Sequence, residues 1–345
     1  MTIGWYVHHH GAGHLTRLLA VRPHLEDEVV VLSSMPAPSS LPSRTRWVAL
    51  PRDDDGFGGS TGAAEAPVEA DPTVGGLLHW APLGHAGHRT RLATIADVAR
   101  DSTLDAMVVD VSVEVTLLSR LLGIPTVVFS QPGDRTDEPH RLAYRAASAI
   151  IAPWPEGVLS DAALLPVRDR VRWTGGISRY EPVPSASRSA SPSPRGGGVV
   201  VLGAHPGLDV EGLRLAAEGA GLTLTEVGST PATWTADPWP LLATADVVVS
   251  AAGQNSVADL AAAQARAVVV PQERPFGEQD ATGRALDRLG LAVVAPGAPG
   301  APGVRGVDEW ARLLAGAIGL RPDWGRWQVA GAARRAADSI RGVVS

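Results

Sequence analysis

The sequence predicts an α/β protein with two Rossmann-like domains that face each other across a cleft. Its 345 residues are a natural length for two domains of about 150 residues each. Short β-branched runs alternate with amphipathic stretches, which indicates βαβ units and parallel sheets. Residues 181–198 are rich in Pro, Ser and Gly, so they form a linker that divides this alternation into two series. Ligands of such sheets collect at the carboxyl ends of the strands, which makes the cleft the expected site.

Residues 1–180 are predicted to form the N-terminal domain. The predicted strands are Ile3–His9, Val29–Leu32, Met107–Asp110, Thr126–Phe129 and Ala149–Ala152. The predicted helices cover about Gly13–His24, Arg89–Asp101, Val113–Leu122 and Arg141–Ala147. Residues 53–88 are polar and Gly-rich, and two interpretations stay open for them: an acceptor-binding loop or a disordered surface segment.

Residues 199–322 repeat the pattern and are predicted to form a C-terminal domain. The predicted strands are Val199–Leu202, Leu222–Val227, Val247–Ser250, Ala267–Val270 and Ala292–Val294. The predicted helices cover Val210–Glu218, Trp239–Ala243, Ser256–Gln264 and Gln279–Leu289. An amphipathic helix pair, near Asp308–Ala317 and Trp324–Ile340, ends the chain.

Composition excludes several classes of protein. All 30 basic residues are Arg, the net charge is −6, and no Arg-rich run could follow a phosphate backbone, so no nucleic acid partner is expected. The absence of Cys excludes disulfides, thiolate zinc sites and cysteine nucleophiles. The start of the chain lacks a signal-peptide pattern, and no apolar run reaches the roughly 20 residues of a membrane helix. We expect a cytoplasmic protein, with peripheral membrane contact left open.

The first motif is His-Gly-Ala-Gly-His at residues 10–14, between a predicted strand and a predicted helix. Gly11 and Gly13 permit a tight turn and close approach of a ligand, and the helix start offers free N–H groups to a phosphate. The dinucleotide fingerprint G-x-G-x-x-G is incomplete because Thr16 stands at its last position. A purely steric use of the two glycines stays open.

The candidate catalytic residues are His14 and Asp110. A neutral imidazole at a helix start can take a proton from an acceptor hydroxyl near pH 7, which suits His14 to the role of general base. Asp110 ends a predicted strand, where it could orient the histidine or simply cap the next helix.

Metal binding by the N-terminal polar residues is the less favoured interpretation. A set of His8, His10 and His14 has no acid near it in the sequence, so packed and hydrogen-bonded histidines are preferred. The run Asp53–Asp55 is interpreted as solvated charge, and no residue is assigned to a metal. Three further histidines could line an acceptor site: His79, His85 and His88.

The second motif follows the strand that ends at Ser250. Gly253 lets the chain approach a diphosphate, and a polar helix start then supplies N–H and hydroxyl donors from Gln254, Asn255 and Ser256. Asp259 lies one turn further on, where it could accept hydrogen bonds from ribose hydroxyls. In the alternative interpretation, Asn255 or Ser256 only caps the helix.

The third motif spans residues 271–280 and ends in Glu278, Gln279 and Asp280 at a predicted helix start. Carboxylates and an amide at this edge of the sheet could bind the hydroxyls of a hexose. Acids are also favoured there by the helix dipole alone, so a structural role stays open.

In order, these motifs resemble the family 28 glycosyltransferases, the type that adds N-acetylglucosamine to a lipid-linked peptidoglycan precursor. The resemblance covers about residues 199–295 and is supported by GAGHLTRLLAV near the N-terminus. It implies the GT-B fold, with an acceptor domain at residues 1–180 and a donor domain at residues 199–322. The last helix, residues 323–345, would pack back toward the N-terminal domain.

The resemblance also implies residue roles. The donor diphosphate would lie against Gly253 to Ser256, the ribose against Asp259, and the hexose against Gln279 with Asp280 or Glu278. The loop after the strand Val199–Leu202 matches the family's Gly-Gly-Ser-x-Gly loop, which would bring Gly203, His205 and Gly207 to the nucleotide. Asp259, His205 and Thr282 replace the family's Glu, Ser and Asn, which leaves the donor and the acceptor open.

The sequence therefore predicts transfer of a hexose, with N-acetylhexosamine among the candidates, from a UDP-sugar to an acceptor hydroxyl. The reaction is expected to invert the anomeric carbon, to need no metal, and to use the UDP-sugar as substrate with no cofactor. The acceptor could be a small molecule, a glycan or a lipid-linked molecule. The alternatives are a nonhydrolysing sugar-nucleotide epimerase and a non-catalytic sugar-nucleotide-binding subunit.

Overall fold

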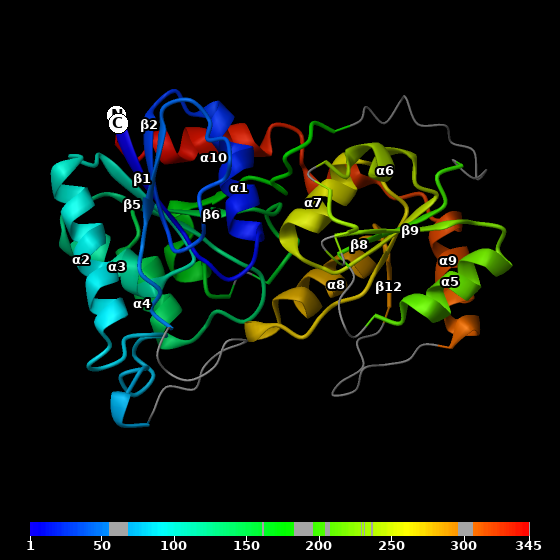
Figure 1. Ribbon diagram of the computed structural model, residues 1–345, viewed down its shortest axis with the longest axis horizontal. Helices are drawn as coiled ribbons and strands as arrows, with labels where there is room; N and C mark the ends of the chain where they lie inside the picture. Colours follow the sequence, from blue (N-terminus) through cyan, green and yellow to red (C-terminus); the bar gives the residue numbers. More distant parts are fainter. Residues whose placement is uncertain are drawn as a thin grey trace. The chain divides into compact units, whose positions relative to one another are not determined.

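A computed structural model of the chain contains two compact units (Figure 1). It describes residues 1–54, 68–160, 162–182, 196–203, 208–228, 230, 232–235, 237–295 and 306–344. Unit 1 comprises Met1–Pro153, Asp161–Thr174 and Ala333–Ser345, and unit 2 comprises Trp154–Ser160 and Gly175–Ala332. Most of the predicted linker, residues 183–195, lies outside the described residues, and so do residues 55–67 of the predicted loop.

In the described part of unit 1, seven parallel strands form one sheet in the order β3-β2-β1-β4-β5-β6-β7. The strands are β1 (Thr2–Val7), β2 (Glu28–Ser33), β3 (Thr45–Ala49), β4 (Ala106–Asp110), β5 (Thr126–Phe129), β6 (Ala149–Ala152) and β7 (Val171–Trp173). The helices are α1 (Gly13–Val21), α2 (Ala86–Asp101), α3 (Val113–Leu121), α4 (Glu138–Ala146) and α10 (Ala332–Arg341), with short 3-10 turns at η1 (Arg22–His24), η2 (Val68–Ala70) and η3 (Leu165–Arg170).

The strand order of unit 1 places helices on both faces of its sheet. The connection from β1 to β2 runs toward one edge of the sheet, whereas the connections from β3 to β4, β5 and β6 run toward the opposite edge. Right-handed crossovers therefore put α1 on one face and α2, α3 and α4 on the opposite face, as Figure 1 shows. The order reverses between β1 and β4, and the crevice at the carboxyl ends of these two strands is where such sheets bind ligands.

Unit 2 has a second parallel sheet, with five described strands in the order β12-β11-β10-β8-β9. They are β8 (Val199–Leu202), β9 (Leu224–Val227), β10 (Val247–Ser250), β11 (Ala267–Val269) and β12 (Val293–Val294). The helices are α5 (Val210–Gly219), α6 (Trp239–Thr244), α7 (Gln254–Ala262), α8 (Glu278–Arg288) and α9 (Val307–Gly319), with 3-10 turns at η5 (Pro275–Gly277) and η6 (Trp324–Trp327).

Alternate residues of the unit 2 strands pack into two separate cores. Val199 and Val201 of β8 pack with α5 and α9, whereas Val200 packs with α6, α7 and α8. A strand that is apolar at every position is buried on both faces, which is typical of a parallel sheet between two helix layers. The prediction of two Rossmann-like α/β domains is confirmed.

Two strands of unit 1 are absent from the sequence prediction. β3 and β7 form the two edges of the sheet, and their side chains are only partly buried. Thr-Arg-Trp-Val-Ala and Val-Arg-Trp lack the continuous apolar run that identifies a central strand. Among the helices that the structure describes, none is long and apolar enough to cross a membrane.

Candidate active site

The turn between β1 and α1 brings His14 to the carboxyl edge of the unit 1 sheet. Gly11 has a backbone φ of 87°, in the left-handed region that favours glycine, and space around its Cα is open. α1 begins at Gly13, and its N-cap residue Ala12 makes no side-chain capping bond. The first motif therefore ends in a helix start whose second residue is His14.

His14 and Asp110 form a hydrogen-bonded pair. Nδ1 of His14 lies 2.9 Å from Oδ1 of Asp110, and Nη1 of Arg17 donates to the same oxygen at 2.6 Å. Asp110 and Arg17 are buried, while the His14 side chain keeps 12% of its surface exposed. The end of β4 thus holds a buried carboxylate against a histidine that solvent or a substrate can reach.

Arg17 and His14 keep Asp110 ionised. Burial by itself raises the pKa of this carboxyl, but the charges and hydrogen bonds of Arg17 and His14 outweigh burial and hold the pKa below its ordinary value. An ionised carboxylate can only accept, so Nδ1 of His14 carries the hydrogen of this bond. Nε2 of the neutral ring then keeps a free lone pair, as a general base requires.

The alternative in which Asp110 caps the next helix is wrong. The N-cap of α3 is Ser112, whose hydroxyl accepts from the backbone N–H of Val115. Between the two lies Val111, with φ at 64°. A β-branched residue in the left-handed region is strained, and such strain is typical of functional sites.

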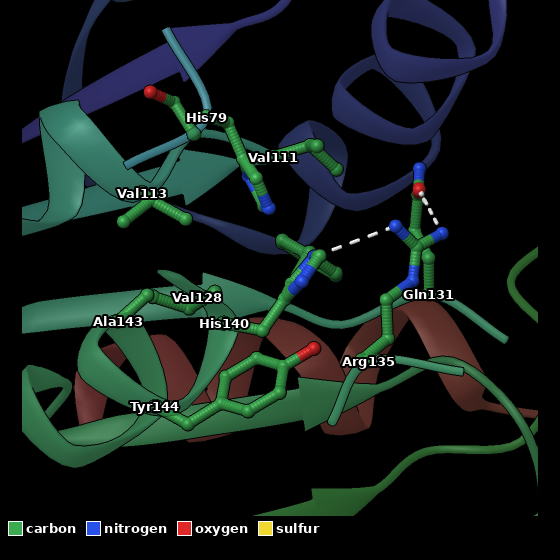
Figure 2. A pocket seen from close by; sticks show the side chains of 11 residues that line it. His79, Val111, Val113, Val128, Gln131, Arg135, His140, Ala143 and Tyr144 are labelled. Atoms are coloured by element: carbon green, nitrogen blue, oxygen red, sulfur yellow. Dashed lines mark hydrogen bonds between the residues drawn. The ribbon is translucent and has the colours of Figure 1, made fainter. Parts of the chain in front are cut away.

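A small pocket opens beside this turn, on the α3 and α4 side of the sheet (Figure 2). Its volume is about 40 Å³, which has room for two or three water molecules or one small chemical group. The lining is mainly apolar, with polar groups at one end: His79, Val111, Ser112, Val113, Val128, Phe129, Gln131, Arg135, His140, Ala143 and Tyr144.

Glu114 holds the segment that carries His79 over the pocket. Its Oε1 accepts from the backbone N–H groups of His79 at 2.9 Å and Trp80 at 3.0 Å, and its Oε2 accepts from Ser112 at 3.0 Å. One carboxylate thus ties a loop to the start of α3, immediately after Asp110.

The polar end of the pocket is a hydrogen-bonded group of side chains. Nε2 of His79 lies 2.7 Å from Asp137, and Nδ1 of His140 also bonds to Asp137. Burial is the main cause that lowers the pKa of His140 to about 4, so its ring is neutral at pH 7. Figure 2 shows the rings of His79 and His140 directed toward one another, with Arg135 bonded to His140 and Gln131.

In unit 2, the second motif forms the end of β10 and the start of α7. The N-cap of α7 is Gly253, with no side-chain capping bond, so the alternative in which Asn255 or Ser256 caps this helix is wrong. Gln254, Asn255 and Ser256 instead form its first turn. The N–H groups of the first turn of a helix carry partial positive charge and are suited to an anion.

Asp259 lies on the buried side of α7. It is 4% exposed, accepts from the Ser178 hydroxyl at 2.6 Å, and lies 3.7 Å from Nε of Arg179. Burial outweighs these two partners and raises the pKa of Asp259 to about 6. In this structure the carboxylate is engaged by Ser178.

Gln279 connects the ends of two strands. Its Oε1 accepts from the backbone N–H of Ala252 after β10 and of Gln272 after β11, both at 3.0 Å. Its neighbours Glu278 and Asp280 are half-buried and exposed, respectively, in the first turn of α8. The second and third motifs therefore meet at the carboxyl edge of the unit 2 sheet.

The loop after β8 is only partly described. Gly203 has φ at 67° and donates from its backbone N–H to Val227 at 2.8 Å. His205 and Gly207 lie outside the described residues.

Comparisons with known proteins connect this geometry to a family. Residues 232–297 match the glycosyltransferase family 28 C-terminal domain. The matched residues include the end of β10, all of α7, and Gln279 with its two backbone partners after β10 and β11. The chain has the GT-B fold, and this family 28 match lies in its second unit.

Solved structures similar to this glycosyltransferase match its whole length at low sequence identity. The glycotransferase of kitacinnamycin is 15% identical, with a TM-score of 0.65, over 100% of this chain and 99% of that one. UGT2 of Phytolacca americana, in complex with UDP-2-fluoro-glucose and pterostilbene, is 16% identical, with a TM-score of 0.62, over 99% and 94%. MurG of Acinetobacter baumannii is 16% identical, with a TM-score of 0.58, over 99% of both chains. No curated protein sequence matches the chain.

Three residues that support the candidate site were not predicted from the sequence. Arg17 follows His14 by one helical turn on α1, so their i, i+3 spacing was the available signal. Glu114 and Asp137 act through partners 35 and 58 residues away along the chain, and no local pattern indicates such pairs.

Asp259→Asn is expected to raise the free energy of unfolding of the glycosyltransferase by about 1–3 kcal/mol near pH 7.5. The carboxyl has a higher pKa folded, about 6, than its ordinary 3.8, so its ionisation destabilises the fold as pH rises through that interval. Asparagine removes the charge and still accepts from Ser178. Urea unfolding near pH 7.5 and near pH 4 measures the gain, which should vanish at the lower pH.

The matched control is Glu273→Gln, which neutralises an exposed carboxylate of the same unit and should leave the unfolding curve unchanged. A loss of stability in Asp259→Asn near pH 7.5 would show that the ion pair with Arg179 outweighs burial.

Proposed function

We propose that this glycosyltransferase moves a hexose from a UDP-sugar to an acceptor hydroxyl, with inversion and without a metal in the transfer step. N-acetylhexosamine is among the candidate sugars. The observation that carries the proposal is the pair of His14 and the ionised Asp110 at the strand-order reversal of unit 1. A histidine oriented by a buried, ionised carboxylate, in a chain whose second unit matches a donor domain, supports this reaction.

In the proposed step, His14 removes the proton from the acceptor hydroxyl. The acceptor oxygen forms a bond to the anomeric carbon of the donor sugar as the bond from that carbon to the diphosphate oxygen breaks. Nε2 of His14 takes the proton, and Asp110 stabilises the imidazolium through Nδ1. Arg17 keeps Asp110 in the ionised form that this role needs.

The leaving diphosphate is assigned to the start of α7. Gly253 lacks a side chain that would block approach, and the first-turn N–H groups of Gln254, Asn255 and Ser256 can stabilise the developing negative charge. Gly11, Gly13 and the loop with Gly203, His205 and Gly207 are assigned to the nucleotide on the resemblance to family 28.

The donor's sugars are assigned to Asp259 and to the start of α8. A ribose hydroxyl at Asp259 would share or replace the Ser178 bond. Because Oε1 of Gln279 already accepts two backbone N–H groups, Gln279 would use its amide N–H groups toward the hexose. Glu278 and Asp280 supply carboxylate acceptors beside it.

We expect saturable binding of at least one UDP-sugar, with slow release of UDP. Other structures of this fold carry UDP-2-fluoro-glucose, in UGT2 of Phytolacca americana, or thymidine diphosphate, in the spinosyn rhamnosyltransferase SpnG, so the panel includes UDP- and dTDP-sugars. Isothermal titration and nucleotide release measure the two quantities.

Each outcome of the donor panel distinguishes one function. No binding and no hydrolysis with any donor would reject the proposal. A second sugar nucleotide formed without acceptor would identify an epimerase. Binding that never leads to turnover, with a broad panel of hydroxylated acceptors present, would identify a non-catalytic subunit.

A further inference from the structure

Three side chains at the end of β1 converge on one point in unit 1. Beyond Val7 the chain turns through residues 8–10, and Asp54 approaches from the segment that follows β3. Oδ2 of Asp54 lies 3.5 Å from Nε2 of His9 and 3.7 Å from Nε2 of His10. The three atoms lie within 4.8 Å of one another. We refer to His9, His10 and Asp54 as the His9 cluster.

The His9 ring is buried without a hydrogen bond. Only 4% of its side-chain surface is exposed, and in the part of the chain that the structure describes neither ring nitrogen has a hydrogen-bond partner. A buried polar group left in this state costs about 1–3 kcal/mol, so native proteins normally satisfy it. The nitrogen nearest to Asp54 requires a partner that a bound ion would supply.

The separations in the His9 cluster are those of ligands that share an ion. At 3.5 and 3.7 Å, the N···O distances exceed the usual range of hydrogen bonds, about 2.7–3.2 Å. Ligands at about 2.0–2.1 Å from a tetrahedral zinc ion are about 3.3 Å apart, by simple geometry. Small side-chain adjustments would bring the three atoms to that spacing.

We propose that the His9 cluster binds one divalent transition-metal ion of the zinc type. Two imidazole nitrogens and one carboxylate oxygen favour Zn²⁺, Co²⁺ or Ni²⁺ over Mg²⁺ or Ca²⁺, which prefer oxygen ligands. His10 is exposed, so water can complete the coordination from that side.

The hydrogen bonds of Asp54 leave it able to act as a ligand of this ion. Arg52 donates to both carboxylate oxygens, and Oδ2 has a second lone pair for an ion.

The polar group at the pocket does not suit a metal, although it also combines two histidines and an aspartate. His79 lies at hydrogen-bond distance from Asp137, 2.7 Å, and His140 is bonded to it as well, so no space for an ion separates them. Arg135 donates toward Nε2 of His140 at 3.4 Å. If a metal bound Nδ1 of His140, Nε2 would carry the ring hydrogen. That hydrogen would then face the N–H donor of Arg135, which is unfavourable.

A metal in the His9 cluster would link Asp54 to the turn between β1 and α1, which contains Gly11. It would stabilise unit 1 and take no part in bond breaking, so this proposal does not depend on the glycosyl transfer proposed above. From the sequence, the run Asp53–Asp55 was interpreted as solvated charge. That interpretation is wrong for Asp53 and Asp54, whose side chains are 14% and 24% exposed and pair with arginines, and Asp55 lies outside the described residues.

The test is a titration of the untagged, chelator-treated full-length chain with ZnCl₂ alone. We expect one Zn²⁺ per chain, a rise in the thermal midpoint on binding, and the visible spectrum of four- or five-coordinate Co²⁺ with CoCl₂. His9→Ala and Asp54→Asn should each weaken Zn²⁺ binding by more than about tenfold. Asp137→Asn, the matched change in the pocket group, should leave binding unchanged.

Absence of saturable Zn²⁺ binding by the wild-type chain would overturn the proposal. So would binding that survives both His9→Ala and Asp54→Asn, or that is lost in Asp137→Asn alone. Circular dichroism checks that each variant is folded. If His9→Ala does not fold, Asp54→Asn decides the outcome, because Asp54 lies in a partly exposed segment after β3.

Discussion

His14→Ala lowers the rate of sugar transfer by about 10²–10⁴-fold, the usual contribution of a general base. The loss is expected in kcat, with the donor's dissociation constant unchanged, because none of the contacts proposed for the donor uses the His14 side chain. Release of UDP in the presence of whichever acceptor the wild-type protein uses measures the rate. Imidazole added to the buffer should restore part of it, since the truncated side chain leaves space for a small base.

The matched control for this variant is His24→Ala. His24 is a half-buried histidine in the same unit, in η1, and it has no part in the candidate site. Its replacement should leave the rate unchanged. Full activity in His14→Ala would remove His14 from the mechanism, while loss of activity in both variants would point to damage to unit 1 as a whole.

Asp110→Asn lowers both the stability and the rate. It leaves the guanidinium of Arg17 buried without its carboxylate, and breaking a buried ion pair from one side costs about 3–5 kcal/mol of unfolding free energy. It also removes the negative charge that stabilises the imidazolium of His14, so the rate is expected to fall by roughly 100-fold or more. Urea unfolding and the UDP-release assay measure the two effects.

The double variant Arg17→Met/Asp110→Asn separates these effects. Methionine fills most of the space of Arg17 without a charge, so most of the lost stability should return, but the rate should not. Recovery of the rate together with the stability would assign Asp110 a purely structural role.

The dependence of stability on acidic pH tests the pair of Asp110 and Arg17 in a second way. Because the folded pKa of Asp110 lies below its ordinary value, the pair stabilises the wild type above about pH 4 and loses this contribution as pH falls through the folded pKa. The double variant lacks Asp110 as a titrating group, so its stability should decline less steeply below pH 4 than that of the wild type.

Elements with a strong local pattern were predictable from the sequence. β1, β4, β5, β8 and β10 are buried on both faces, and their apolar runs are visible without a structure. The helix starts after Gly11 and Gly253 were also predictable, because glycine precedes a periodic segment at both places. The edge strands β3 and β7 were not, since residues exposed on one side need no apolar run.

Local sequence patterns predict which residues begin helices and end strands, and therefore which side chains reach the two carboxyl edges. Periodicity and glycine placement are local, so they act within a few residues along the chain. On that basis His14, Asp110, Gly253 and Gln279 were identified as site residues.

The partners of these residues depend on the tertiary structure. Asp110 bonds to His14 and Arg17, which are 96 and 93 residues away in sequence, and Asp259 bonds to Ser178, which is 81 residues away. Partners of a buried charge are set by which strands become neighbours in the sheet and which helix faces pack against them. The approach of Asp54 to His9 was not predictable for the same reason. Whether a buried ring nitrogen has a hydrogen-bond partner also depends on packing, which no local pattern shows.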